Sequence, residues 1–209
     1  KQWLLNVPAQ PSIRGDGFTV TGPEGKGKLD CYTVWPQGAS IASVPLSAVD
    51  PGAGLQGWQV QVTPPTLQAD DVFLHVLNVA DAGSAGAASA FDVVRIRATQ
   101  GNMIGAHFRN PSGNRLVLFS ADPQARPPTG QVVYTFQPTA DTRHRLTNLV
   151  PGRAYAVTVH VYGASHEATV QPGAGFRASA QGTLGFTTTM GGRVLPAYWR
   201  AYLPLVVRE

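Results

Sequence analysis

The chain has 209 residues, of which 43% are hydrophobic and only 13% are charged. This composition excludes intrinsic disorder, which needs many charges and few apolar side chains, and the length suffices for one large all-β domain or two small ones. The net charge of +4 comes from lysines and arginines that are scattered along the chain, so we predict no nucleic-acid partner.

In chain order, apolar and polar residues alternate in five segments, at 17–22, 58–64, 91–99, 131–138 and 154–163. This period of two is typical of half-buried antiparallel strands, and no segment has helical spacing. Glycine and proline separate the segments as turn residues. We therefore predict an all-β fold, an antiparallel β-sandwich that forms one large unit or two packed sandwich subdomains, with few or no helices.

Two segments, 72–79 and 115–121, are apolar on both faces. A strand of this kind must be covered on both sides, which predicts a position in the middle of a sheet. A third layer, from a part of the protein absent from this chain, would supply the second cover. His75 lies in the first segment, where we expect a core residue with one hydrogen bond rather than a catalyst. Asp70 and Asp71 precede it, but too few oxygen ligands surround them for a calcium site.

The segment 146–163 resembles the corner of a fibronectin type III or related immunoglobulin-like sandwich. Leu149, Pro151, Gly152 and Tyr155 carry this resemblance, followed by alternating valines. It implies a tyrosine corner, in which the ring of Tyr155 fills the core and its hydroxyl holds the preceding loop. Such a corner indicates a fold and carries no function.

Three blocks in the N-terminal half, "KQWLLNVPAQPSIRGDGFTV", "GKLDCYTVWPQGASIASV" and "GWQVQVTPPTLQADDVFLHVLNVAD", have a characteristic order and spacing. Together they resemble the C-terminal β-sheet region of heparinase II/III-like polysaccharide lyases, over residues 1–82 and more loosely over 103–187. The resemblance implies a polysaccharide, or a missing upstream catalytic domain, as the partner. The helical toroid of the family is absent, and "PLSAVDPGAGL" replaces its Gly-Gly-Pro-Gly segment. No catalytic motif of the family matches this chain, so we assign no catalytic residue.

The chain divides, in this prediction, into a first sandwich part at 1–100, a second sheet part at 101–189 and a tail at 190–209. The stretch "TQGNM" near residues 99–103 is the expected break between the first two parts. The tail resembles short C-terminal tails on secreted proteins of filamentous green bacteria, which implies a secreted or cell-surface bacterial protein. The alternative is an edge strand that pairs back on the domain, with Pro204 restricting it to an edge or a bulge.

The remaining candidate residues are aromatic side chains and titratable groups without a recognisable motif. Trp35, Trp199 and Tyr162 are candidates for stacking on sugar rings, whereas Trp58 is expected in the core. Cys31 is a lone cysteine and is expected as a buried thiol. The other four histidines have no metal-ligand spacing, so we predict no metal and no cofactor. The "RGDG" stretch is read as a turn, and no segment is long and apolar enough for a membrane span.

These observations lead to three hypotheses about function. The first is a non-catalytic β-sandwich domain of a secreted heparinase II/III-like protein, which would support a missing catalytic toroid. The second is a carbohydrate-binding or cell-surface adhesion module. The third is an independent hydrolase or lyase with its site in a cleft between sheets, which would need polar side chains converging from several strands.

Overall fold

The structure is a computed structural model that describes residues 1–66, 71–82, 92–109, 113–122, 128 and 130–197. Strands account for most of these residues. Helix among them is limited to a 3-10 turn, η1 (Pro23–Gly25), and a single turn, α1 (Leu46–Val49). The prediction of an all-β fold with few helices is therefore confirmed.

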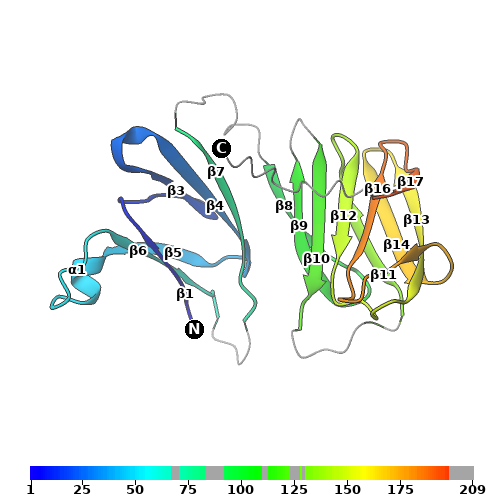
Figure 1. The fold of residues 1–209 in the computed structure, drawn as a ribbon, viewed down its shortest axis with the longest axis horizontal. Coiled ribbons are helices and arrows are strands. Elements are labelled where there is room, and N and C mark those ends of the chain that lie inside the picture. The colour runs from blue at the N-terminus through cyan, green and yellow to red at the C-terminus, as the bar shows by residue number, and fades with distance from the viewer. Residues whose placement is uncertain (67–70, 83–91, 110–112, 123–127, 129, 198–209) are drawn as a thin grey trace, which may run out of the picture.

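The N-terminal half forms one sandwich from a three-stranded and a four-stranded antiparallel sheet (Figure 1). The first sheet has the order β1-β6-β5 and the second the order β2-β3-β4-β7. Their strands are β1 (Trp3–Val7), β2 (Ser12–Arg14), β3 (Gly17–Thr21), β4 (Gly27–Trp35), β5 (Ser40–Pro45), β6 (Trp58–Thr63) and β7 (Leu74–Asp81). The alternation predicted for β6 is confirmed, because Val60 and Val62 lie fully buried in the core between the sheets.

The C-terminal half forms a second sandwich from a six-stranded sheet, β17-β16-β12-β10-β9-β8, and a four-stranded sheet, β11-β14-β13-β15. Strands β10 and β12 pair in parallel, whereas the other named neighbours are antiparallel. The strands are β8 (Asp92–Arg97), β9 (Met103–Arg109), β10 (Asn114–Ser120), β11 (Val132–Phe136), β12 (Thr142–Leu146), β13 (Ala154–Tyr162), β14 (Ser165–Pro172), β15 (Phe176–Arg177), β16 (Leu184–Thr188) and β17 (Val194–Pro196).

The tyrosine corner of the second sandwich is present. Tyr155 is 1% exposed in the core, and its hydroxyl accepts a hydrogen bond of 3.0 Å from the backbone N–H of Val150. The ring therefore fills the core while the hydroxyl holds the loop before β13, as the sequence predicts.

The boundary between the sandwiches differs from the predicted one. Strand β8 pairs along its length with β9, so the division lies in the connection from β7 to β8 and not at 99–103. The "TQGNM" stretch is the turn of the β8–β9 hairpin, in which Gly101 and Asn102 both have positive φ. This turn chemistry is typical of a hairpin as well as of a linker. Strand β17, near the start of the predicted tail, pairs with β16 at the edge of the six-stranded sheet. The segment around Pro204, to which the two alternatives for the tail refer, lies outside the described residues.

Strand β7 lies at the edge of its sheet, so the predicted position in the middle of a sheet is wrong. The predicted third layer exists, but this chain itself supplies it. Val34, Trp35 and Val76 of the first sandwich pack against Ile104 and Ala106 on the outer face of the six-stranded sheet. Figure 1 shows β4 and β7 beside β8 and β9. The second apolar face of β7 is therefore explained by contact with the neighbouring sandwich and not by a central position between two strands.

Arg95 of β8 ties the two sandwiches together. The register of β4 against β7 shifts between Thr33 and Trp35, which leaves the backbone between them out of the regular ladder. The Nε of Arg95 donates to the carbonyl of Val34 at 2.6 Å, and one of its terminal nitrogens donates to the Thr33 carbonyl at 3.3 Å and to Asp16 Oδ2 at 2.5 Å. One guanidinium group therefore donates hydrogen bonds to two backbone carbonyls in the irregular segment of the other sandwich.

We expect Arg95→Ala to lower the free energy of unfolding by about 2 kcal/mol, because the buried carbonyls lose a charged donor. Urea denaturation of the variant measures this change. Arg193→Ala, at an exposed arginine in the β16–β17 turn, is the control and should stay within about 0.5 kcal/mol of the wild type. An Arg95 variant as stable as the control would mean that the contacts between the sandwiches do not depend on this side chain.

Candidate groove between the sandwiches

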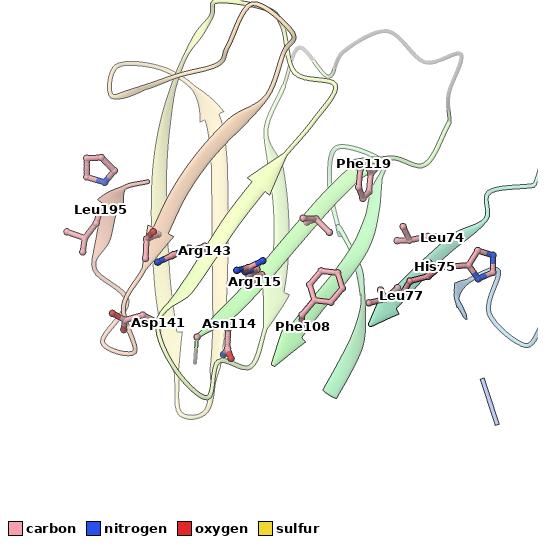
Figure 2. A pocket seen from close by; sticks show the side chains of 15 residues that line it. Leu74, His75, Leu77, Phe108, Asn114, Arg115, Phe119, Asp141, Arg143 and Leu195 are labelled. Carbon is pink, nitrogen blue, oxygen red and sulfur yellow. The ribbon is translucent and has the colours of Figure 1, made fainter. Parts of the chain in front are cut away.

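A groove of about 840 Å³ runs along the outer face of the six-stranded sheet, where the first sandwich leaves that face uncovered. Strand β7 forms one wall, with Leu74 and Leu77, and Leu195 and Pro196 of β17 form the opposite rim. Figure 2 shows the groove from close by, with the side chains of both sandwiches along it. A site of this size between two packed units is typical of ligand-binding sites in proteins.

Alternation along β10 builds the floor of the groove. Leu116 and Leu118 are fully buried in the second core, which turns Arg115, Val117 and Phe119 outward into the groove. Phe119 is 39% exposed there. The apolar residue pattern that suggested a strand covered on both faces therefore produces one core face and one half-open apolar face.

Two arginines lie side by side on this floor. The parallel pairing of β10 and β12 places Arg115 directly opposite Arg143, and neighbouring strands are about 4.8 Å apart. Both side chains are exposed, and neither forms an ion pair or a side-chain hydrogen bond with any described residue. Two like charges in this position repel each other, so the pair lowers stability unless an anion lies against it.

Asp141 is the acidic residue among those that line the groove. Its Oδ1 accepts a hydrogen bond of 3.2 Å from the backbone N–H of Met190, which orients it toward the β16–β17 turn. The groove lining therefore includes two arginines and one carboxylate, and that carboxylate is hydrogen-bonded to the β16–β17 turn. This balance makes the floor electropositive and attracts anions into the groove.

His75 belongs to the wall of the groove, but its ring packs into the first sandwich. The ring stacks on Trp3 at 3.8 Å between centroids, and Nδ1 lies 3.2 Å from the hydroxyl of Thr33. Figure 2 shows the ring turned away from the floor. Burial lowers the pKa of His75 to about 4, so it is neutral at pH 7 and a weak base. The prediction of a packed histidine with one hydrogen bond is confirmed.

The three aromatic candidates for sugar stacking do not meet in this groove. Trp35 is 8% exposed, the guanidinium of Arg97 lies 4.8 Å from its ring centre, and its Nε1 donates to the Gly105 carbonyl at 3.4 Å. Trp35 therefore packs between the sandwiches and has no face open to a sugar, which corrects the prediction for that residue. Tyr162 is 63% exposed on β13, in the sheet on the far side of the second core. Trp199 lies outside the described residues.

Other titratable candidates have structural roles. Cys31 is a buried free thiol whose pKa burial raises to about 12, as expected for a packing residue. Asp16 of the "RGDG" stretch forms the turn between β2 and β3 and pairs with Arg95. Asp71 is described and half-buried, whereas Asp70 lies outside the described residues. Within the described ranges, no group of three or more histidine, cysteine or acidic side chains is placed to hold a metal ion.

The sequence pattern did not identify Arg115 and Arg143 as a pair. Their strands are parallel neighbours, although the connection between them includes another strand, β11, in the other sheet. The sequence has a local basic cluster, "RHR" at 143–145, among otherwise scattered charges, and "RLVLFSA" at 115–121 has the pattern of a two-faced strand. Only the pairing of β10 with β12 shows that Arg115 and Arg143 are neighbours.

No protein-family model matches the sequence, and no curated protein matches it. The resemblance to heparinase II/III-like lyases therefore stays a prediction. No helix of the described residues is long and apolar enough to cross a membrane.

Proposed function

We propose that this chain is a non-catalytic module that binds an acidic polysaccharide in the groove between its two sandwiches. The observation that carries the proposal is the pair Arg115 and Arg143, exposed on neighbouring strands without an acidic partner among the described residues. A planar guanidinium binds carboxylate and sulfate groups through two parallel hydrogen bonds, and such contacts are the strong ones.

The apolar side chains of the groove fit the apolar faces of the sugar rings. Each sugar ring has faces of C–H groups that pack on apolar or aromatic side chains. Val117 and Phe119 lie on the same strand as Arg115, and Leu77 of β7 faces them at 50% exposure. A chain that carries anionic groups on an apolar ring skeleton therefore contacts the arginines and this surface together.

The groups in the groove support binding rather than elimination. Elimination from a uronate needs a base for the proton alpha to the carboxylate and an acid for the leaving oxygen. Asp141 is held by the Met190 backbone, and the ring of His75 packs on Trp3 outside the floor. We therefore expect no unsaturated uronate, measured by ultraviolet absorbance, when the chain alone is incubated with heparan sulfate, alginate or hyaluronan. Steady product formation would contradict the non-catalytic part of the proposal.

In this proposal the chain is the β-sheet domain of a larger, secreted heparinase II/III-like protein, and its groove holds the polysaccharide for a catalytic toroid. The support for this parentage is the order of the three sequence blocks. An acidic polysaccharide of the extracellular matrix or cell wall as the ligand would place the module outside the cell or on the bacterial surface.

Affinity electrophoresis and calorimetry with alginate, hyaluronan and heparan sulfate test the binding, with dextran as the neutral control. We expect measurable affinity for one or more acidic polymers, little for dextran, and weaker binding when the ionic strength rises from about 0.05 M to about 0.5 M. Equal affinity for dextran, or no binding of any acidic polymer at low salt, would contradict the proposal.

A further inference from the structure

Three histidines lie in the core of the second sandwich, behind the groove floor. His107 of β9, His144 of β12 and His166 of β14 are 1%, 0% and 2% exposed. Their rings surround Phe136 of β11, with centroid distances of 5.8, 4.9 and 5.4 Å respectively. Because the phenyl ring separates them, they form a packed group and not a set of metal ligands. We call these three residues the histidine cluster.

The hydrogen bonds and buried nitrogens of the histidine cluster involve no charged partner among the described residues. Nδ1 of His144 lies 2.9 Å from the hydroxyl of Tyr134, and its Nε2 lies 2.8 Å from the hydroxyl of Thr188. Nε2 of His107 and Nδ1 of His166 are buried and have no hydrogen-bond partner among the described residues. A proton added to Nε2 of His107 would create a buried N–H donor, and a positive charge, without an acceptor.

The charged groups near the cluster do not favour protonation. The pKa of His107 is lowered to about 4, mainly by burial and then by the charge of Arg109, while Asp92, which pairs with Arg109, acts in the opposite direction. Burial lowers the pKa of His144 well below its usual range, and the positive forms of His107 and His166 add to this effect. Tyr134 and Thr188, the other polar groups that contact His144, offer hydroxyls and no negative charge.

The cluster and the groove share their strands. Along β9, His107 lies between Ala106 and Phe108, and Phe108 lines the groove. Along β12, His144 follows Arg143, so the imidazole points into the core while the arginine points into the groove. Any opening of the core around these rings therefore displaces the strands that position the groove floor.

We propose that the histidine cluster makes ligand binding in the groove acid-labile, so that a polyanion held at neutral pH is released reversibly on acidification. This inference rests on the proposed function for its ligand, but the acid-dependent opening of the second sandwich is independent of it.

The sign of the effect follows from proton uptake. An unfolded histidine has a pKa of about 6.5, so below this value the opened chain binds protons that the folded core excludes. Folding is therefore fully favoured above pH 6.5 and weakens as the pH falls toward the lowered pKa values. A histidine whose folded pKa lies below the pH reduces the folding equilibrium constant by at most about tenfold per pH unit in this interval, and His107 and His144 act in the same direction.

The charges of the arginines and of a sulfated ligand do not change between about pH 6.5 and about pH 4.5. Arginine stays protonated, and a sulfate ester stays ionised, far below pH 5. Dextran sulfate is therefore a suitable probe, because a loss of binding between about pH 6.5 and about pH 4.5 must come from the protein. Near-ultraviolet circular dichroism of the full chain, recorded in the same buffers, reports whether the aromatic core opens.

The experiment measures the affinity for dextran sulfate and the dichroism from about pH 7.5 to about pH 4.5, in both directions. We expect the affinity to fall by about tenfold or more and to recover on return to neutral pH. His107→Gln should move the midpoint of both changes to lower pH, because it removes one titrating ring. His160→Gln, at an exposed histidine on the far sheet, should leave the midpoint unchanged.

The outcomes separate the two proposals. Constant affinity down to about pH 4.5, or the same midpoint in His107→Gln, would overturn the acid-release proposal while the groove remains a binding site. No binding at pH 7.5 would overturn the proposed function, and the dichroism midpoints would still decide whether the cluster controls opening. If His107→Gln does not fold, NMR titration of the wild-type histidine C2 protons decides: protonation of the buried rings before the core opens would overturn the proposal.

Discussion

Gly105→Ala is expected to lower the free energy of unfolding by about 3 kcal/mol or more, the largest effect on stability that we predict for a single methyl group. A Cβ atom at this position would lie 1.8 Å from the carbonyl oxygen of Val117 and 2.8 Å from its carbonyl carbon. Both atoms belong to the backbone of the neighbouring strand β10, so no side chain can rotate to make room. The strands β9 and β10 would have to separate.

The consequences reach the groove and the contact between the sandwiches. The carbonyl of Gly105 accepts the hydrogen bond from Trp35 of the first sandwich, and Val117 lines the groove. Gly27→Ala is the matched control, because Gly27 also lies in a strand but a Cβ there meets no atom within 4 Å. Urea denaturation of both variants is the measurement. A Gly105 variant as stable as the Gly27 variant would contradict the close approach of β9 and β10.

Replacing both Arg115 and Arg143 by alanine is expected to weaken binding of an acidic polysaccharide by about 100-fold. Each guanidinium that binds a carboxylate or sulfate contributes about 1.5–3 kcal/mol, and 1.4 kcal/mol corresponds to tenfold in affinity. Because both side chains are exposed, the variant should keep the stability of the wild type, or gain a little from the loss of mutual repulsion.

Conservative variants separate charge from geometry. Arg115→Lys with Arg143→Lys keeps the charge but loses the planar pair of donors, so we expect an affinity between those of the wild type and the alanine variant. Arg193→Ala removes one exposed positive charge of the β16–β17 turn, which does not line the groove, and should change the affinity little. If the double alanine variant and the Arg193 variant lose the same small amount, general charge and not the groove floor determines binding.

Local alternation predicted some of the strands, namely β3, β6, β8, β11 and β13. The valines of β6 and the inward residues Ile96 and Ala98, in β8 and just after it, lie where period two places them, and Tyr155 forms the corner that the resemblance to a fibronectin type III sandwich implies. These features depend on neighbouring residues, and burial of one strand face has the same pattern in any sandwich.

Long-range pairing was not predictable in the same way. The pattern of β7 required cover on both faces, but it did not distinguish a central strand from an edge strand that lies against a second sandwich. The pairing of β10 with β12 and the packing of three histidines around Phe136 depend on which strands become neighbours. The three histidines lie far apart in the sequence, and so do the two arginines, so no local motif shows that either group comes together.

Arginine-selective modification by a dicarbonyl reagent, read by peptide mass spectrometry, tests the central claim most directly. In the free protein we expect Arg115, Arg143 and Arg193 to react, because all three are exposed. A bound acidic polysaccharide should protect Arg115 and Arg143 and leave Arg193 reactive. Equal modification of Arg115 and Arg143 with and without the bound polymer would contradict the assignment of the groove as its binding site.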